Sequence, residues 1–302
     1  IGTLKMAISL RFVVTLAALS CGLTIGGAGC TMDSDTTSTN IPQPEHVVIV
    51  MFENKDYAQV YDTSIAPFIQ TLIHDPQTAV FTNSLAMGHP SQPNYIWWFS
   101  GDDQGVTTND RPATKFNTPN LAAELIQNGF SFVTYSENLP FVGFDGDSSE
   151  NGLYVRRHNP VSNWIGLDVN QVSPDVSQPF SAFPANFDHL PTVSFVVPNM
   201  INGMHNGTIT EGDTWLQNSL SEYIEYCRNN PSLLVVTFDE TTYNVTDNRI
   251  LTLCFGSLVN GGEYDAAVSH VNFLRTFEDM FSLPHAGLSG YLEPISNCWV
   301  QE

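Results

Sequence analysis

Five short runs rich in β-branched and aromatic residues constrain the fold more than any other feature of the sequence. A strand with one face in water alternates polar and apolar residues, whereas a nearly continuous apolar run is typical of a strand buried on both faces. The runs are His46–Phe52, Phe130–Tyr135, Val193–Val197, Leu233–Phe238 and Ile250–Phe255. Such strands need helices on both sides of their sheet.

Segments with helical spacing of apolar residues lie between and after these runs. They cover Ile65–Ile73, the stretch from Asn120 to Gln127 with Thr118 as N-cap and Pro119 in the first turn, Asp213–Arg228 and His270–Phe281. Strands that alternate with helices favour an α/β protein with right-handed crossovers. The sequence therefore predicts a three-layer α/β/α sandwich around a mostly parallel central sheet.

The chain divides into a leader, a linker and one domain. Residues 1–30 resemble an export signal, with Arg11 ahead of a short apolar run and small residues before Cys30. The residues leave open whether Cys30 carries a lipid or the chain is simply secreted. Residues 31–44 are a polar linker, and residues 45–302 are the predicted catalytic domain. We expect a secreted, periplasmic or cell-surface protein.

Within the domain, residues 139–191 lack clear periodicity and are rich in Gly, Pro, Ser and Asn. So long an irregular stretch is typical of a cap or an active-site insertion. Three cysteines lie in the domain, Cys227, Cys254 and Cys298, enough for at most one internal disulfide.

The charge balance limits the partners of the protein. Ten Lys and Arg stand against 31 Asp and Glu, a formal net charge of −21. A surface this acidic repels nucleic acid and anionic lipid, so we expect membrane contact only through a lipid at Cys30. Nothing in the sequence indicates a protein partner. An anionic substrate would need a local cluster of cations or hydrogen-bond donors.

Two of the apolar runs end abruptly in adjacent oxygen-bearing side chains. Glu53 and Asn54 follow Phe52, and Asp239 and Glu240 follow Phe238. The carboxyl ends of parallel strands share one edge of a sheet, where ligands bind. Carboxylates gathered there repel one another unless a cation lies between them. The alternative is ordinary solvation of strand ends.

Ser91 lies where a loop becomes a helix, in the segment His89-Pro90-Ser91-Gln92. A helix N-terminus lowers the cost of negative charge, so a serine there could act as a nucleophile beside a metal. The alternative is a plain N-cap serine, which is far more common. Three histidines in polar positions, His158, His205 and His270, are candidates for binding phosphate.

At these residues the chain resembles the phosphoesterase family of bacterial and fungal secreted acid phosphatases and phospholipases C, in the alkaline phosphatase superfamily. The resemblance runs from residue 46 to about 288 and rests on the blocks HVVIVMFEN, HPSQPNY, NLAAEL, PFSAFP, LPTVSFVVPN, NGMHNG, SLLVVTFDE and SHVNFLRTFEDMF.

The resemblance implies a metal-dependent acid phosphatase that acts through a phosphoserine on a small phosphate monoester or a phosphoinositide-like substrate. It implies as metal ligands Glu53, Asn54, Ser91, Asp239 and Glu240, and as residues around the phosphoryl group Ser91, Asn94, His158 and His205. His89 and His270 lie in matching blocks without an assigned role. A ligand set of hard oxygens favours one divalent ion, Ca²⁺, Mg²⁺, Mn²⁺ or iron, over zinc.

Two alternatives remain open on the sequence alone. The first is a phospholipase C that cleaves phosphodiesters, although those relatives are usually longer. The second is a surface lipoprotein that keeps the fold without catalysis, although the complete set of candidate site residues speaks against it.

Overall fold

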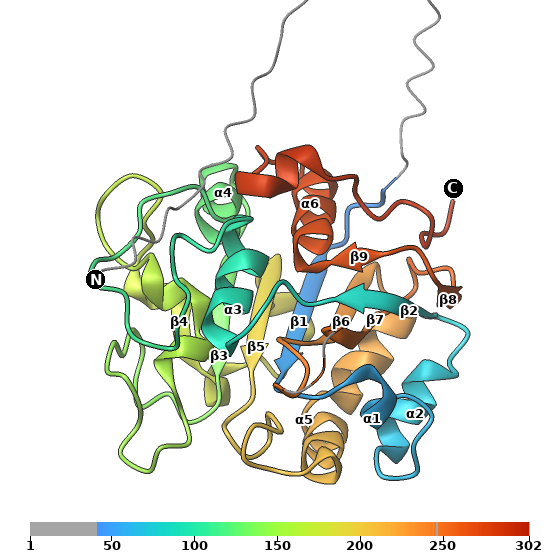
Figure 1. Ribbon diagram of the computed structural model, residues 1–302. Coiled ribbons are helices and arrows are strands. Elements are labelled where there is room, and N and C mark those ends of the chain that lie inside the picture. Colours follow the sequence, from blue (N-terminus) through green and yellow to red (C-terminus); the bar gives the residue numbers. More distant parts are fainter. Residues whose placement is uncertain (1–40, 244, 246, 302) are drawn as a thin grey trace, which may run out of the picture. The chain divides into compact units, whose positions relative to one another are not determined.

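A computed structural model describes residues 41–301 of the chain, apart from residues 244 and 246 (Figure 1). The proposed leader at residues 1–30, which includes Cys30, and residues 31–40 of the proposed linker lie outside the described residues. Cys227, Cys254 and Cys298 are buried free thiols.

The core of the fold is a nine-stranded mixed sheet. Its strands are β1 (His46–Phe52), β2 (Thr78–Leu85), β3 (Phe132–Ser136), β4 (Ser177–Pro179), β5 (Val193–Val197), β6 (Ser232–Phe238), β7 (Arg249–Phe255), β8 (Gly262–Tyr264) and β9 (Val268–Ser269). The order is β4-β3-β5-β1-β6-β7-β2-β8, and β9 pairs with β2. All neighbours are parallel except those of β7, which runs antiparallel to β6 and β2.

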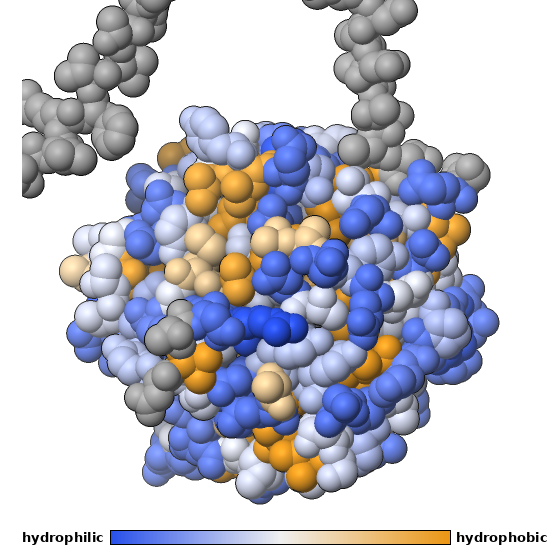
Figure 2. Space-filling view, turned by 45° about the vertical axis from the view of Figure 1, so that its right-hand side comes forward, coloured by the Kyte–Doolittle hydropathy of each residue, from blue (hydrophilic) through white to orange (hydrophobic). Residues whose placement is uncertain are grey.

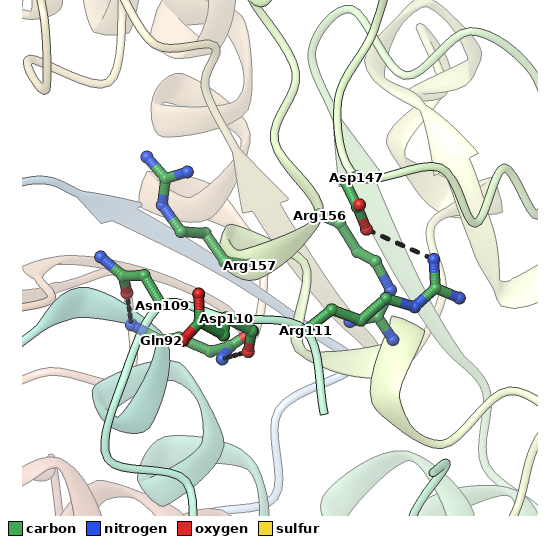
Figure 3. Close-up of a pocket in the computed structure, with 7 residues that line it drawn as sticks. All are labelled: Gln92, Asn109, Asp110, Arg111, Asp147, Arg156 and Arg157. Carbon is green, nitrogen blue, oxygen red and sulfur yellow. Dashed lines mark hydrogen bonds and ion pairs between the residues drawn. The ribbon is translucent and has the colours of Figure 1, made fainter. Parts of the chain in front are cut away.

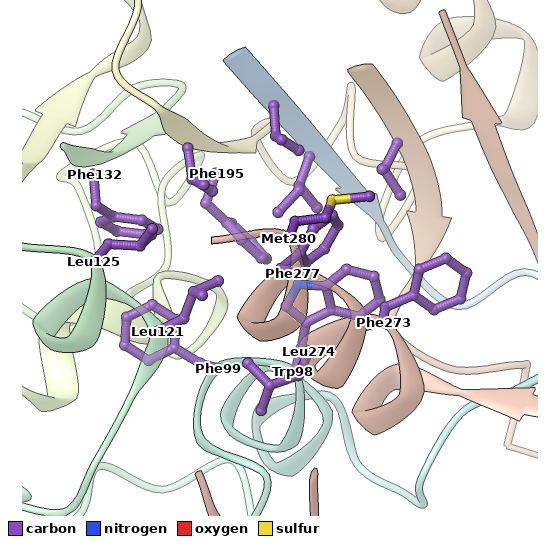
Figure 4. Close-up of a cluster of buried hydrophobic side chains, with 14 of the residues drawn as sticks. Trp98, Phe99, Leu121, Leu125, Phe132, Phe195, Phe273, Leu274, Phe277 and Met280 are labelled. Carbon is purple, nitrogen blue, oxygen red and sulfur yellow. The ribbon is translucent and has the colours of Figure 1, made fainter. Parts of the chain in front are cut away.

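Helices cover both faces of this sheet, as the buried strands require. They are α1 (Tyr57–Val60), α2 (Pro67–Ile73), α3 (Ser91–Ser100), α4 (Leu121–Gln127), α5 (Ile209–Asn229) and α6 (His270–Met280). One apolar cluster joins the sheet to α3, α4 and α6, and a second joins its other face to α1, α2 and α5. In the first cluster Trp98 of α3 stacks on Phe273 of α6 (Figure 4). The predicted α/β sandwich with a mostly parallel sheet is confirmed.

Two predicted helix starts were wrong. The N-cap of α4 is Asn120, whose side chain accepts from the Ala123 N–H at 3.0 Å, and Pro119 precedes the cap. Helix α5 begins at Ile209, four residues before the predicted start, because Thr208 and Glu211 form a capping box. In both places a polar side chain at a position other than the predicted one satisfies the first free N–H groups.

The segment 139–191, all of which the structure describes, contains no α-helix. It holds five 3₁₀ turns and the edge strand β4. Trp164 of this segment is buried against Phe99 of α3, with 5.2 Å between ring centroids. The segment is therefore packed onto the layer that carries the helix starting at Ser91.

The surface combines hydrophilic residues with small apolar patches (Figure 2). The most exposed large apolar side chains, Leu167, Tyr291, Tyr243 and Val169, are spread over several loops. Among the described residues, none of the helices has the length and apolar character needed to cross a membrane.

Two buried carboxyl groups on neighbouring helices make the stability of the fold depend on pH. Burial, together with the charge of Glu278, raises the pKa of Glu124 to about 8. Burial also raises the pKa of Glu278 to about 7, against the opposing effect of hydrogen bonds from Ser289 and Ala286. An unfolded glutamate titrates near pH ~4.3. The folded state thus holds these protons more tightly, and that stabilisation is fully present below pH ~4 and lost as the pH rises through 7 and 8.

We expect Glu124→Gln to reduce the fall in stability between pH 5 and pH 8, because a neutral amide has the same shape as the carboxyl group and never ionises. The Tm of the variant should exceed that of the parent by about 3 °C or more at pH 8 and match it at pH 5, as measured by thermal denaturation. Glu222→Gln, at an exposed position of α5, is the control and should show no pH-dependent difference. Equal Tm differences at both pH values would contradict this account.

Candidate active site

The ends of β1 and β6 lie side by side and bring their polar residues together. The two strands are parallel, with Phe52 opposite Phe238. The Asp239 N–H donates to the Phe52 carbonyl at 2.9 Å, and the Asn54 N–H donates to Asp239 Oδ1 at 2.9 Å. The register of the sheet therefore places Glu53 and Asp239 at the same edge.

Asn54 takes a backbone conformation that few residues other than glycine tolerate. Its φ is 53°, in the left-handed region, and its side-chain Nδ2 donates to Glu53 Oε2 at 3.0 Å. Asparagine is among the residues that adopt this conformation most readily. The turn directs the backbone N–H of Asn54 at the Asp239 carboxylate and its side chain at the Glu53 carboxylate.

Ser91 lies between two buried carboxyl groups. Its Oγ donates to Glu53 Oε2 at 3.2 Å or to Glu240 Oε1 at 3.1 Å, and its side chain is almost fully buried. Pro90 is the N-cap of α3, and Ser91 is the first residue of the helix. The hydroxyl therefore points at carboxylates rather than capping the helix, which excludes the N-cap interpretation.

The site concentrates three carboxyl groups whose pKa values are raised by burial. Burial and the charge of Asp239 raise the pKa of Glu53 well above its usual value, and the same two causes raise the pKa of Glu240 to about 8. Burial raises the pKa of Asp239 as well, against hydrogen bonds that lower it. Asp239 Oδ2 is buried with no hydrogen-bond partner among the described residues. An unpaired buried carboxylate oxygen is costly unless a cation binds there.

His158 and His205 meet on the other side of Glu53. The Nδ1 atom of His158 is 3.3 Å from Glu53 Oε1, and the two imidazole centroids are 5.6 Å apart. Ligand atoms of Glu53, His158 and His205 all lie within 4.8 Å of one another, close enough to hold a metal ion. The ligand set expected from the sequence contains no histidine, whereas the structure places two histidines within reach of Glu53. The segments that carry them meet only in the folded chain.

Burial lowers the pKa of His158 well below its usual value, with smaller contributions from Arg157 and His205. Its ring stacks on Tyr95 with 5.3 Å between centroids. The stacking and the contact with Glu53 fix the orientation of the imidazole. Its Nε2 has no partner among the described residues and is free to act as a ligand or a hydrogen-bonding group.

The structure adds three residues to which the sequence gave no role. The Tyr95 hydroxyl donates to Glu53 Oε1, His89 Nδ1 lies 2.7 Å from Glu240 Oε2, and Lys55 Nζ donates to the Met204 carbonyl at 2.7 Å. Tyr95 follows Ser91 by four residues on α3, so helical spacing alone would have placed both on one face. No sequence signal pointed to the tie between Lys55 and the loop that carries His205.

Two other candidates, Asn94 and His270, make hydrogen bonds mainly to the backbone of neighbouring segments. The Asn94 amide accepts from the N–H groups of Met87 and Gly88 and donates to the Gly88 and Pro90 carbonyls, while its Nδ2 also lies 3.4 Å from Glu240. It shapes the loop before Ser91 at the edge of the site. His270 is fully buried, its Nε2 lies 3.0 Å from the Phe238 carbonyl, and burial lowers its pKa to about 4.

A cavity of about 200 Å³ includes in its lining the chain neighbours of Ser91 and His158 (Figure 3). It is lined by Gln92, Asn109, Asp110, Arg111, Asp147, Arg156 and Arg157. Gln92 adjoins Ser91 in the chain, and Arg157 adjoins His158. The Gln92 side chain donates to the Thr108 and Asp110 carbonyls, which fixes the wall of the cavity to the first turn of α3.

The mixed sheet and its two helical layers share their fold with solved structures of the alkaline phosphatase superfamily. A solved structure described as a protein of that superfamily from Vibrio parahaemolyticus matches with a TM-score of 0.54 over 85% of this chain and 72% of that chain, at 10% identity. The C-terminal periplasmic domain of EcEptC from Escherichia coli, solved in complex with Zn, matches with a TM-score of 0.50 over 85% of this chain and 92% of that one, at 10% identity.

The chain belongs to the Phosphoesterase family, whose sequence model matches residues 59–284. It is 38% identical over 291 residues to the phosphatidylinositol-3-phosphatase of Mycobacterium tuberculosis, which covers 96% of this chain and 94% of that protein. It is also 29% identical over 79% of its length to a probable acid phosphatase of Kluyveromyces lactis, of which the match covers 58%. The chain is accordingly a phosphoric ester hydrolase.

Proposed function

We propose that the protein is a metal-dependent acid phosphatase that hydrolyses phosphate monoesters through a phosphoserine at Ser91. The observation that carries the proposal is the Ser91 hydroxyl, buried at the start of α3 and directed at Glu53 and Glu240. The names of the relatives, a phosphatidylinositol-3-phosphatase and a probable acid phosphatase, support a phosphate monoester or a phosphoinositide-like substrate.

The proposed reaction has two displacements at phosphorus. In the first, Ser91 Oγ forms a bond to phosphorus while the bond to the ester oxygen breaks and the leaving alcohol takes up a proton. In the second, water forms the new bond, the Oγ–P bond breaks and Ser91 regains its proton, which releases inorganic phosphate. The chain positions the nucleophile through the start of α3 and hydrogen bonds the phosphoryl oxygens through His158 and His205.

The donor atoms fit a divalent metal ion. We assign as its ligands Glu53, Asn54, Ser91, Asp239 and Glu240, since Asp239 Oδ2 is buried without a partner and the three carboxyl groups crowd together. Such an ion would polarise the phosphoryl group and favour the deprotonated form of the serine. Glu53 also belongs to the triad with His158 and His205, so nitrogen ligands, which suit zinc and iron, are available beside the oxygen set.

A comparison of two chromogenic substrates tests the reaction class. We expect kcat/KM for p-nitrophenyl phosphate to exceed that for p-nitrophenylphosphorylcholine by at least about a hundredfold, because the monoester offers one more free phosphoryl oxygen for the site to bind. The measurement is p-nitrophenol release at about pH 4 to 8 with divalent metals added singly. Faster cleavage of the diester would favour a phospholipase C, and no release under any condition would favour a non-catalytic protein.

A further inference from the structure

We propose that the cavity lined by Gln92 and Arg157 is the subsite for the leaving group and that Arg157 binds a second negative charge on it. The inference rests on the proposed phosphatase function and adds a substrate class: phosphate monoesters whose leaving alcohol is itself anionic. Arg157 is then a specificity residue for the reaction at Ser91.

Arg157 differs from the other cations of the described chain. Each of the others is bound: Lys55 to the Met204 carbonyl, Arg111, Lys115 and Arg156 to Asp145, Arg228 to Asp75, Arg249 to the Thr82 carbonyl, and Arg275 to Asp279. Arg157 makes no hydrogen bond or ion pair with any described residue, and its Nε is buried without a partner. Carboxylates outnumber cations in this chain, which has a net charge of −21. An arginine without a carboxylate partner is therefore unexpected.

The cavity gives this guanidinium a place to bind an anion. Of the other two arginines in the lining, Arg111 pairs with Asp145 and Asp147, and Arg156 pairs with Asp145 and donates to Asn163. Figure 3 shows the Arg157 side chain directed away from the Arg111–Asp147 ion pair. Asp110 is the acidic lining residue without a cationic partner, and it opposes anions at its own side of the cavity.

The position of the cavity indicates which part of a substrate enters it. Its lining contains none of the strand-end carboxylates and neither His158 nor His205, but it includes Gln92 and Arg157, which adjoin Ser91 and His158 in the chain. We therefore infer that the cavity adjoins the proposed phosphoryl site without overlapping it. A group bound there must extend beyond the phosphorus atom. Gln92 is almost fully buried and its Oε1 has no partner, which provides an acceptor for a hydroxyl of the same leaving group.

Two esters of similar size isolate the charge of the leaving group. Glycerol 2-phosphate releases a neutral alcohol, whereas 2-phosphoglycerate releases an alcohol that carries a carboxylate. We expect Arg157→Gln to lower the ratio of kcat/KM for 2-phosphoglycerate to that for glycerol 2-phosphate by about tenfold or more, the loss typical of a charged hydrogen bond. Arg157→Lys, which keeps the positive charge, should retain part of the preference for 2-phosphoglycerate. Arg228→Gln is the control for net charge. It removes one positive charge from the end of α5, where Arg228 pairs with Asp75.

The outcomes separate this inference from the proposed function. An unchanged ratio of the two kcat/KM values would overturn the subsite. If both kcat/KM values fell by the same factor, Arg157 would act on the transferred phosphoryl group instead. Hydrolysis of p-nitrophenyl phosphate but of neither ester would overturn the substrate class. If the parent hydrolyses none of the three esters, the proposed function fails. The subsite is then tested by calorimetric affinities of the two esters for Ser91→Ala, with and without Arg157→Gln: an unchanged affinity ratio would overturn the inference, and a tenfold fall would support it.

Discussion

Ser91→Ala should lower kcat/KM for p-nitrophenyl phosphate by about a thousandfold or more while the protein stays folded. The substitution removes the only oxygen that the proposed reaction can attach to phosphorus in its first step. It leaves Ala at the first position of α3, where the cap is Pro90 and the side chain caps nothing. The loss should therefore be confined to catalysis, and steady-state kinetics combined with far-ultraviolet circular dichroism would measure it.

Ser100→Ala is the matched control, because Ser100 is a buried serine of the same helix whose hydroxyl donates to the Ile96 carbonyl. It should retain kcat/KM within about threefold. Acid quenching of the parent during turnover, followed by mass spectrometry, should find one phosphoryl group on the peptide that contains Ser91. Substantial turnover by a folded Ser91→Ala protein would dismiss the serine as nucleophile.

Asp239→Asn should reduce activity by at least about a hundredfold and abolish stabilisation by metal ions. Asp239 is fully buried and offers one carboxylate oxygen that no described residue binds. Asn keeps the shape and the acceptor for the Asn54 N–H but removes a negative charge from a crowded site. Without metal, the variant should therefore be at least as stable as the parent, since one source of repulsion is gone.

Thermal denaturation with and without added divalent ions measures this second prediction without any assay of turnover. The parent Tm should rise with metal and fall again with a chelator, whereas the Asp239→Asn protein should show no shift. Asp265→Asn, at an exposed position, is the control and should respond as the parent does. An undiminished metal response in Asp239→Asn would remove this residue from the ligand set.

Much of the fold could be predicted because buried strands need apolar residues at successive positions. The run from His46 to Phe52 coincides with β1, and the two residue pairs after β1 and β6 do lie at one edge of the sheet. The antiparallel direction of β7 could not be read in this way, since a central strand has the same composition in either direction. Strand β2 escaped prediction because Thr82, Asn83 and Ser84 interrupt its apolar pattern.

The candidate site was predictable where it depends on local sequence and unpredictable where it depends on packing. Strand ends and the start of α3 are local features, and they led to Glu53, Asp239 and Ser91. The meeting of His158 with Glu53, however, depends on how an irregular segment packs against α3, which no periodicity encodes. The unpaired state of Arg157 is likewise a property of its surroundings: its neighbour Arg156 has the same chemistry and is fully bound.

The placement of β1 between β5 and β6 has a consequence for how this enzyme comes into being. The first strand of the domain pairs only with strands from its second half, and the hydrogen-bonded residues Asn54 and Asp239 are 185 positions apart in the chain. Contacts of such long range form slowly, because the entropy of closing a long loop must be lost before the contact is gained. We therefore expect the pairing of β1 with β6, and with it the site at Glu53 and Asp239, to form late in refolding, after the local helices.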